Sequence, residues 1–308
     1  MFMSPTNWDL ASLICKLFVY FGAASLVGGS LFLWLYNDGS RKTSVTILRY
    51  MALGTFFGFQ GSLFNFLIQV GMVVDNGLGG MFDFGMATIF LDTQLGDTTF
   101  FRLGGFVLSF TISCFYLYRI GALDKTPPSA FYYFLNSINI VAFLLIAFSF
   151  RFSGHISVLS FIAKLSIAIH FFAFAAWIGS LYPLYRLTYL ENINIMQISM
   201  KKFGDNAIAL VLILVVAGIL MLLELFHSIN EIFTTPYGQA LLVKLVLVFF
   251  IFGIAGINKL KLTPGLINKR GVLSLRNSIR IEILVAILIV CVTSYFSTIV
   301  GPSEHQMG

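Results

Sequence analysis

Two histidines are the side chains in this sequence best suited to metal chemistry. His155 ends the run Ser153-Gly154-His155, and His170 follows after a short connection, inside an apolar segment. Neutral imidazole suits copper, zinc and iron, and two histidines on facing helix ends can supply two ligands to one ion. A lone histidine in a helix is more often satisfied by a neighbouring helix. The spacing alone therefore leaves a metal or haem role and a structural role equally open.

Three further side chains could shape a site around these histidines. Trp177 follows His170 by seven residues, so the two share one face of a helix. Lys244 and Glu224 are ionisable groups in or beside apolar segments, where each needs a physical explanation. Lys244 can extend its ammonium to the membrane surface or face a polar cavity. Glu224 is either solvated or lines the same cavity as the histidines.

Methionines gather in the connection that follows the second apolar segment. Met72, Met81 and Met86 lie there among several aspartates. Thioethers are soft ligands that select Cu(I), so these residues could capture copper from outside. Methionine is also common in membrane proteins, and the spacings are loose. The sequence therefore leaves a capture surface and ordinary packing open.

Glu282 lies within the last apolar segment, near its predicted cytoplasmic end. An acidic residue inside a membrane is costly unless its charge is balanced. Arg280 precedes it by two residues, so we expect local charge compensation.

Sequence motifs for several other chemistries do not occur. The chain has no Walker A, GxSxG or HExxH pattern. Its three cysteines are isolated in or beside apolar segments without CxxC spacing, which indicates small packing groups and not a disulfide framework or a thiolate site. We therefore expect no enzyme activity. Any energy for transport must come from an ion gradient, a partner or downhill movement.

The elements that must position these residues are membrane-spanning helices. Hydrophobic residues make up 58% of the 308 residues and charged residues only 10%, with a mean hydropathy of +0.91. A soluble domain carries about a quarter charged residues. Runs of about 20 apolar residues cross a bilayer. Eight such runs are found, at 11–36, 46–72, 101–120, 131–151, 161–185, 206–226, 238–257 and 278–300.

These runs predict an all-α polytopic membrane protein. The first run is too long for a signal peptide and lacks a basic stretch ahead of it, so we interpret it as a retained helix. Most of the 19 lysines and arginines fall in alternate connections, and cytoplasmic connections carry such an excess. Both termini are therefore predicted to face the periplasm. The net charge of +6 is a topology signal and gives no indication of nucleic-acid binding.

The sequence also repeats itself. Gly29-Ser30-Leu31 in the first run matches Gly179-Ser180-Leu181 in the fifth. The tetrapeptides at 93–96 and 235–238 each begin with Thr, end with Gly and precede a basic residue by six positions. The matches keep their order along the chain, which favours duplication over coincidence.

Each half would hold four helices, so both halves would have the same orientation. The sequence thus predicts two parallel four-helix repeats, at 1–150 and 151–308. Tyr20 in the first repeat stands where His170 stands in the second. The first repeat therefore gives no indication of whether it keeps a metal ligand.

The second half resembles the CopD/PcoD family of copper-resistance proteins. The segment 170–181 is similar to that family's helix with a His, a small-residue run and Trp-x-Gly-Gly-Leu, except that Ser180 replaces the second Gly. The Gly-His at 154–155, the segment 237–244 (Tyr-Gly-x-x-Leu-x-x-Lys) and the segment 255–259 (Ala-x-x-Asn-basic) follow the family's order.

The resemblance implies an inner-membrane protein involved in copper resistance or in copper import from the periplasm. On this hypothesis His155 and His170 bind copper, as Cu(I) or Cu(II), in an outer-facing cavity whose floor is shaped by Trp177. Lys244 and Glu224 would tune the charge of the cavity, and the methionines would assist capture. A periplasmic copper-carrier protein is the expected partner.

Two other functions could use the same residues. A haem-binding membrane oxidoreductase, similar to the four-helix HemJ-type protoporphyrinogen oxidases, would use an axial His and a basic group for a propionate. A membrane scaffold would dock a periplasmic copper carrier and transport nothing. Iron in the purified protein would favour the first function, and a lack of metal uptake into vesicles would favour the second.

Overall fold

The computed structural model of this protein describes residues 5–36, 40–121, 123, 127–152, 160–190, 192–226 and 228–300. Nearly all of these residues are helical, and none of them forms a strand. Eight helical segments are long and apolar enough to cross a membrane. The prediction of an all-α polytopic membrane protein is confirmed.

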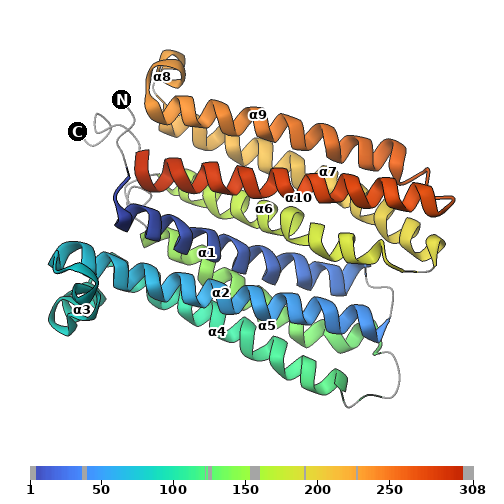
Figure 1. Ribbon diagram of the computed structural model, residues 1–308, viewed down its shortest axis with the longest axis horizontal. Helices are drawn as coiled ribbons and strands as arrows, with labels where there is room; N and C mark the ends of the chain where they lie inside the picture. Colours follow the sequence, from blue (N-terminus) through green and yellow to red (C-terminus); the bar gives the residue numbers. More distant parts are fainter. Residues whose placement is uncertain are drawn as a thin grey trace.

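The long helices lie side by side along the longest axis of the molecule (Figure 1). The first half contains α1 (Asn7–Leu31) with its π-helical extension η1 (Phe32–Tyr36), α2 (Arg41–Val74), η2 (Gly77–Phe82), α3 (Phe84–Leu91), α4 (Gln94–Gly121), η3 (Ser129–Tyr132), α5 (Tyr133–Phe148) and η4 (Ser149–Phe152). The second half contains α6 (Phe161–Leu187), α7 (Ile193–Leu225), α8 (Ile229–Thr234), α9 (Pro236–Ile257), the π-helical η6 (Asn258–Leu262), α10 (Lys269–Tyr295) and the π-helical η7 (Phe296–Val300).

The crossing helices are longer than the apolar runs that predicted them. Helix α7 begins at Ile193 instead of near residue 206. Its 33 residues extend over roughly 50 Å at 1.5 Å per residue, against a hydrocarbon core of about 30 Å. The side chain of Asn192 caps its first turn by accepting a hydrogen bond from the Ile195 N–H. Hydropathy thus marks the part of a helix inside the membrane, whereas capping residues mark where the helix begins.

Helices α1 and α6 cross where two glycines meet. A Cβ on Gly28 would overlap the backbone at Gly179, and a Cβ on Gly179 would overlap the carbonyl of Ala24. The hydroxyl of Tyr50 in α2 donates a hydrogen bond to the Gly179 carbonyl oxygen at 3.1 Å. Small residues let transmembrane helices approach backbone to backbone. The two halves of the chain are therefore in direct backbone contact at this crossing.

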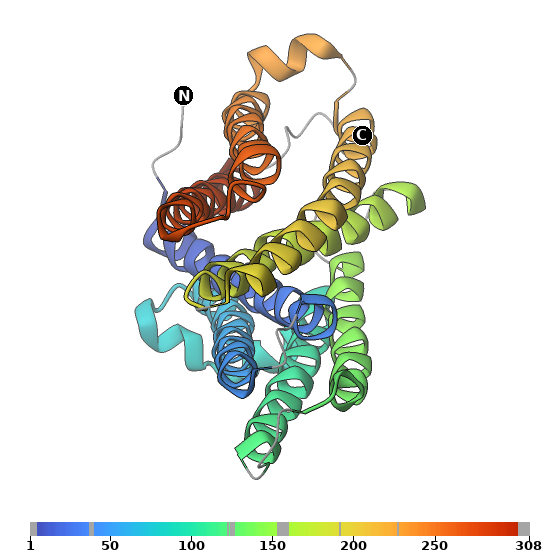
Figure 2. The same ribbon diagram turned by 90° about the vertical axis from the view of Figure 1, so that its right-hand side faces the viewer.

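Most helices of the two halves pack in matching pairs. Helix α1 packs on α2 and α5, just as α6 packs on α7 and α10, and α4 packs on α5 just as α9 packs on α10. One pair differs. Helix α2 packs along α4, whereas their counterparts α7 and α9 stand apart (Figure 2). The second half is therefore the more open of the two.

The short helices also correspond. Gly96 in the first turn of α4 lies against the backbone of Leu91 at the end of α3, and Gly238 of α9 lies against the backbone of Ile232 in α8. A side chain at either glycine would overlap that backbone. This correspondence supports two repeats at 1–150 and 151–308, which stay a prediction.

Helix α1 begins and η7 ends at the end of the bundle that carries α3 and α8 (Figure 1). We call this the α3/α8 end. The opposite end is where α2, α7 and α10 begin and where α4, α6 and α9 finish, and we call it the basic end because most lysines and arginines belong to it. The side of the membrane that each end faces stays a prediction from the positive charges.

Candidate functional site

His170 lies in α6, in the half of that helix nearer the α3/α8 end, and is half-buried. Its Nδ1 is 3.0 Å from the carbonyl oxygen of Leu214 in α7. A carbonyl oxygen can only accept a hydrogen bond, so Nδ1 carries the hydrogen of the neutral imidazole. Metal-binding histidines are commonly oriented by such a bond to a backbone carbonyl. The lone pair that remains for a metal ion is therefore on Nε2.

Lys244 of α9 lies close enough to His170 for the two groups to interact electrostatically. The Lys244 ammonium is 5.7 Å from the ring centroid of Phe296 in η7, within the range of a cation–π contact. The ring of Tyr237, about two helix turns before Lys244, meets the same phenylalanine edge-on, with ring centroids 5.1 Å apart. The Phe296 ring thus contacts a cation beside the candidate ligand.

The first half holds a similar arrangement. Tyr20 of α1 and Arg102 of α4 interact electrostatically. Arg102 donates from Nε to the Ser149 hydroxyl at 3.0 Å and lies 5.4 Å from the ring centroid of Phe150. Each half therefore places a cation over a phenylalanine in the short helix that follows its last crossing helix. The first half pairs this cation with a phenol, and the second half pairs it with an imidazole.

Glu224 lies in the last turn of α7, at the α3/α8 end. Its carboxylate accepts a hydrogen bond from the hydroxyl of Ser160, which is also the N-cap of α6. The bond joins the ends of α6 and α7 on the same side of the bundle as His170. The structure therefore gives Glu224 a contact between helices, and whether it also tunes a metal site stays a prediction.

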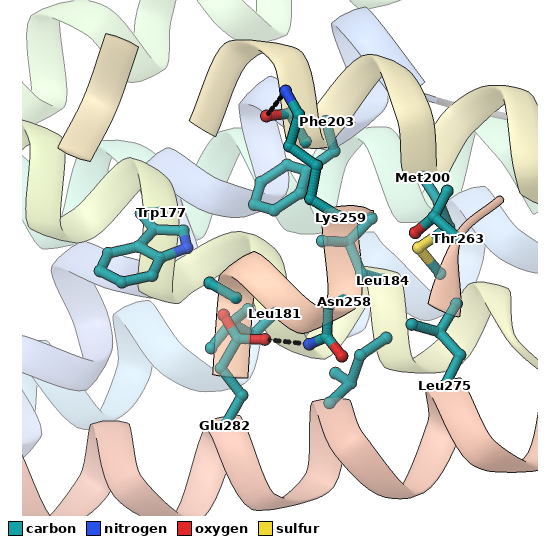
Figure 3. A pocket seen from close by; sticks show the side chains of 13 residues that line it. Trp177, Leu181, Leu184, Met200, Phe203, Asn258, Lys259, Thr263, Leu275 and Glu282 are labelled. Carbon is teal, nitrogen blue, oxygen red and sulfur yellow. Dashed lines mark hydrogen bonds between the residues drawn. The ribbon is translucent and has the colours of Figure 1, made fainter. Parts of the chain in front are cut away.

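Trp177 lies two helix turns from His170 towards the basic end. Its buried ring contacts Phe252, with centroids 5.6 Å apart. It lines a pocket of about 40 Å³ with Asn258 and Glu282, shown in Figure 3. A larger apolar groove of about 430 Å³ lies between α1, α5 and α6. His170 lines neither of these two hollows, and the structure places Trp177 with the first of them.

The three methionines lie at the α3/α8 end but belong to the first half. Met72 is exposed in the last turn of α2, Met81 is in η2 and packs against Gly71, and Met86 is in α3. Helix α3 packs on α2 and α4. These residues therefore form a surface beside the first half, whereas His170 lies in the second.

A second ligand for His170 is the main gap in the site. His155 lies outside the described residues, so its position relative to His170 stays open. Within the described parts of the chain, no group of three or more His, Cys, Asp or Glu side chains could hold a metal ion. What the described geometry does supply is one oriented imidazole with a free Nε2.

Sequence reasoning missed a buried pair at the basic end. Asn258 donates from Nδ2 to Oε2 of Glu282 at 2.7 Å, and Glu282 is only 3% exposed. The prediction that Arg280 balances the charge of Glu282 is wrong, because Arg280 donates instead to the Tyr185 hydroxyl at 3.1 Å. Residues two apart on a helix do not face each other. The apolar residues on either side of Glu282 were the signal that its side chain would be buried.

The comparisons with known proteins point to copper. Residues 198–296 match the family described as copper resistance protein D, and this segment covers most of α7 and all of α8, α9 and α10. Copper transport protein CutJ of Bacillus subtilis (strain 168) is 23% identical over 296 residues, which cover 93% of this chain and 52% of that protein. The chain thus spans about half the length of this curated relative. No solved structure matches.

Proposed function

Because this chain carries the CopD-family segment at residues 198–296, we propose that it is a membrane permease that binds copper at His170 and takes part in copper import or resistance. The single observation that carries the site is the hydrogen bond from Nδ1 to the Leu214 carbonyl, which leaves Nε2 free. The similarity to copper transport protein CutJ supports copper as the cargo. The proposed activity is transport and not catalysis.

In the proposed site His155 is the second ligand. The connection between His155 and His170 is short, and Ser160 fixes the start of α6 between them. Lys244 favours Cu(I) over Cu(II), because its repulsion of a bound ion doubles with the charge of that ion. Met72, Met81 and Met86 lie at the same end of the bundle, and their thioethers suit Cu(I). We propose that they receive copper from a carrier protein in the periplasm.

Inward movement of copper requires the second half to change shape. Its helices α7 and α9 do not pack along each other, unlike α2 and α4 in the first half. Fewer packed contacts lower the free energy needed for local movement. We propose that the path from His170 runs through this looser half towards the basic end, and that the basic end faces the cytoplasm.

Element-resolved mass spectrometry of the detergent-purified protein tests the proposal. After incubation with Cu(I) and removal of the excess, we expect about one copper per chain. His170→Ala and His155→Ala should each lower the copper bound per chain at least tenfold, because each change removes one of the two proposed histidine ligands. Phe172→Ala, a change to an exposed side chain on the same helix, should leave copper unchanged.

Two results would contradict the proposal. Equal copper in wild type and His170→Ala would remove His170 from the site. Iron in place of copper, with a haem absorption spectrum, would favour the haem oxidoreductase instead. Copper uptake into vesicles then separates a permease from a scaffold that only docks a carrier.

A further inference from the structure

The second half contains a small, largely apolar pocket with a few polar side chains, which copper binding at His170 does not use. It lies towards the basic end between α6, α7, α9 and α10 and has a volume of about 40 Å³. Figure 3 shows Trp177, Asn258 and Glu282 around it, with leucines and a phenylalanine completing the wall. Polar side chains in such a setting are costly unless they have a use or a partner.

Glu282 is the unusual member of this pocket. Its side chain is 3% exposed and accepts one hydrogen bond, from the neutral amide of Asn258 at 2.7 Å. An ionised carboxylate needs a cation or several hydrogen-bond donors to offset its lost hydration. One neutral amide does not meet that need. Glu282 therefore requires a bound proton or a positive ion.

Neither Lys259 nor Arg280 supplies the positive charge that an ionised Glu282 would need. Lys259 is the one other ionisable side chain among the described residues that line the pocket, and its ammonium is 2.8 Å from the Asp205 carboxylate of α7 and 2.9 Å from the Gly204 carbonyl oxygen. Arg280, on the same helix as Glu282, donates to the Tyr185 hydroxyl. Both cations thus have partners away from Glu282.

Two buried polar atoms at the pocket lack a protein partner within the described part of the chain. They are Nε1 of Trp177, a donor, and Oδ1 of Asn258, an acceptor. A water molecule needs about 10–15 Å³ and two to four polar partners. The pocket has that room, and these two atoms with the Glu282 carboxylate are suitable partners. Water in the pocket can therefore hydrogen-bond to these atoms and hydrate the Glu282 carboxyl.

The backbone at Asn258 is also irregular. Asn258 begins the π-helical turn η6, and its carbonyl oxygen accepts from the Thr263 N–H at 2.9 Å, five residues on. Such widened turns are rare and often lie at functional sites, because they re-aim a side chain out of the regular helical series. Here the turn coincides with the residue that binds Glu282.

We propose that Glu282, Asn258 and Trp177 form a hydrated proton-binding site, in which Glu282 carries the proton. A metal cation fits less well, because the Trp177 N–H and the Asn258 amide N–H are donors that repel it. The inference deepens the proposed function and rests on it for the link to copper. When a Cu(I) ion passes towards the basic end, the Glu282 carboxyl loses one proton, which water in the pocket carries to the aqueous phase at that end, so one positive charge leaves the pocket as one enters.

Infrared difference spectroscopy of the copper-free protein in lipid nanodiscs tests the proton site directly. As the pH is raised stepwise, the wild type should lose a protonated-carboxyl C=O band that also shifts in D₂O, since water reaches the group. Glu282→Gln should remove that band, and the change preserves side-chain size and the bond to Asn258. Asp205→Asn alters a more exposed carboxylate at the same end and should leave the band in place.

Trp177→Phe is a second variant with an independent readout. It removes the N–H donor together with the smaller ring of the indole but keeps an aromatic ring, so the band should persist but shift, and its exchange in D₂O should change severalfold. A band that survives Glu282→Gln unchanged overturns the proton site. A Trp177→Phe spectrum identical to that of the wild type removes Trp177 from the hydrated site.

Proteoliposomes that contain a pH-sensitive dye test the link to copper. Wild-type vesicles should move protons as they take up Cu(I), and Glu282→Gln should lose this proton movement at least tenfold while still binding copper at His170. Copper uptake with unchanged proton movement in Glu282→Gln overturns the link and leaves the permease intact. Wild-type vesicles that take up no copper contradict the permease, and the infrared result still decides on the proton site.

Discussion

The hydrogen bond between His170 and the Leu214 carbonyl fixes both the tautomer and the direction of the imidazole. The positive charge of the neighbouring Lys244 acts on any ion that binds to Nε2. A bound cation here works against one positive charge, and removing that charge should strengthen binding. His170 thus favours the binding of a cation and Lys244 opposes it, although the sequence predicted that both belong to one cavity.

Lys244→Gln should therefore bind copper more tightly, by on the order of tenfold, which corresponds to about 1.4 kcal/mol. The gain should be larger for Cu(II) than for Cu(I). Competition with a chelator of known affinity measures it, and Lys164→Gln, a lysine on the same helix as His170, is the matched control. Weaker binding in Lys244→Gln would mean that Lys244 holds the site together.

The sequence indicated several of these residues, but not their neighbours. His170, Lys244 and Glu224 stood out because ionisable groups are rare in apolar runs. Their partners in the structure are a backbone carbonyl, an aromatic ring and a hydroxyl, none of which has a sequence signature. The polar pair of Asn258 and Glu282 was missed for the same reason, since its members are far apart along the chain.

At the scale of helices, hydropathy was sufficient to predict the eight crossings. It could not predict α3 and α8, since these have only 8 and 6 residues. Nor could it predict the early start of α7, whose first turns lie beyond the apolar run. Glycines matter at this scale because they decide how closely helices approach, and Gly28 lies at such a close approach, the crossing of α1 and α6.

Gly28→Ala should destabilise the protein by about 1–3 kcal/mol, because the added methyl group would overlap the backbone of α6. Gly104→Ala is the matched control, since Gly104 also lies inside a crossing helix and a Cβ there would meet nothing within 4 Å. That change should be neutral or stabilising by about 0.4–1 kcal/mol. Thermal unfolding in detergent compares the two. Equal melting temperatures would contradict the close crossing.

The first crossing helix begins and the last one ends at the α3/α8 end of the molecule (Figure 1), whereas most basic residues belong to the opposite end. The pairing of helices matches between the halves except for α7 and α9. The sequence could predict the order of the repeated motifs, but it could not predict this difference in packing, because the difference depends on contacts between helices and not on motifs within them.

Reporter fusions test the predicted orientation. Alkaline phosphatase fused after Gly308 should be active, and green fluorescent protein at the same place should be dark, since the positive charges predict a periplasmic C-terminus. A fusion after Lys202, in the first part of α7, should give the reverse pattern. Matching patterns at both positions would contradict the three crossing helices, α7, α9 and α10, that separate them.

The contact between Gly28 and Gly179 also has a mechanical consequence. With no side chains between the two helices, the crossing can serve as a fulcrum about which α6 tilts. Trp177 lies two residues from it, whereas His170 lies nine residues away, roughly 13 Å along the helix. A tilt of about 10° would therefore move His170 by roughly 2 Å and leave Trp177 nearly in place. Such a tilt would therefore move the proposed copper ligand His170 and leave Trp177, in the proposed proton site, almost where it is.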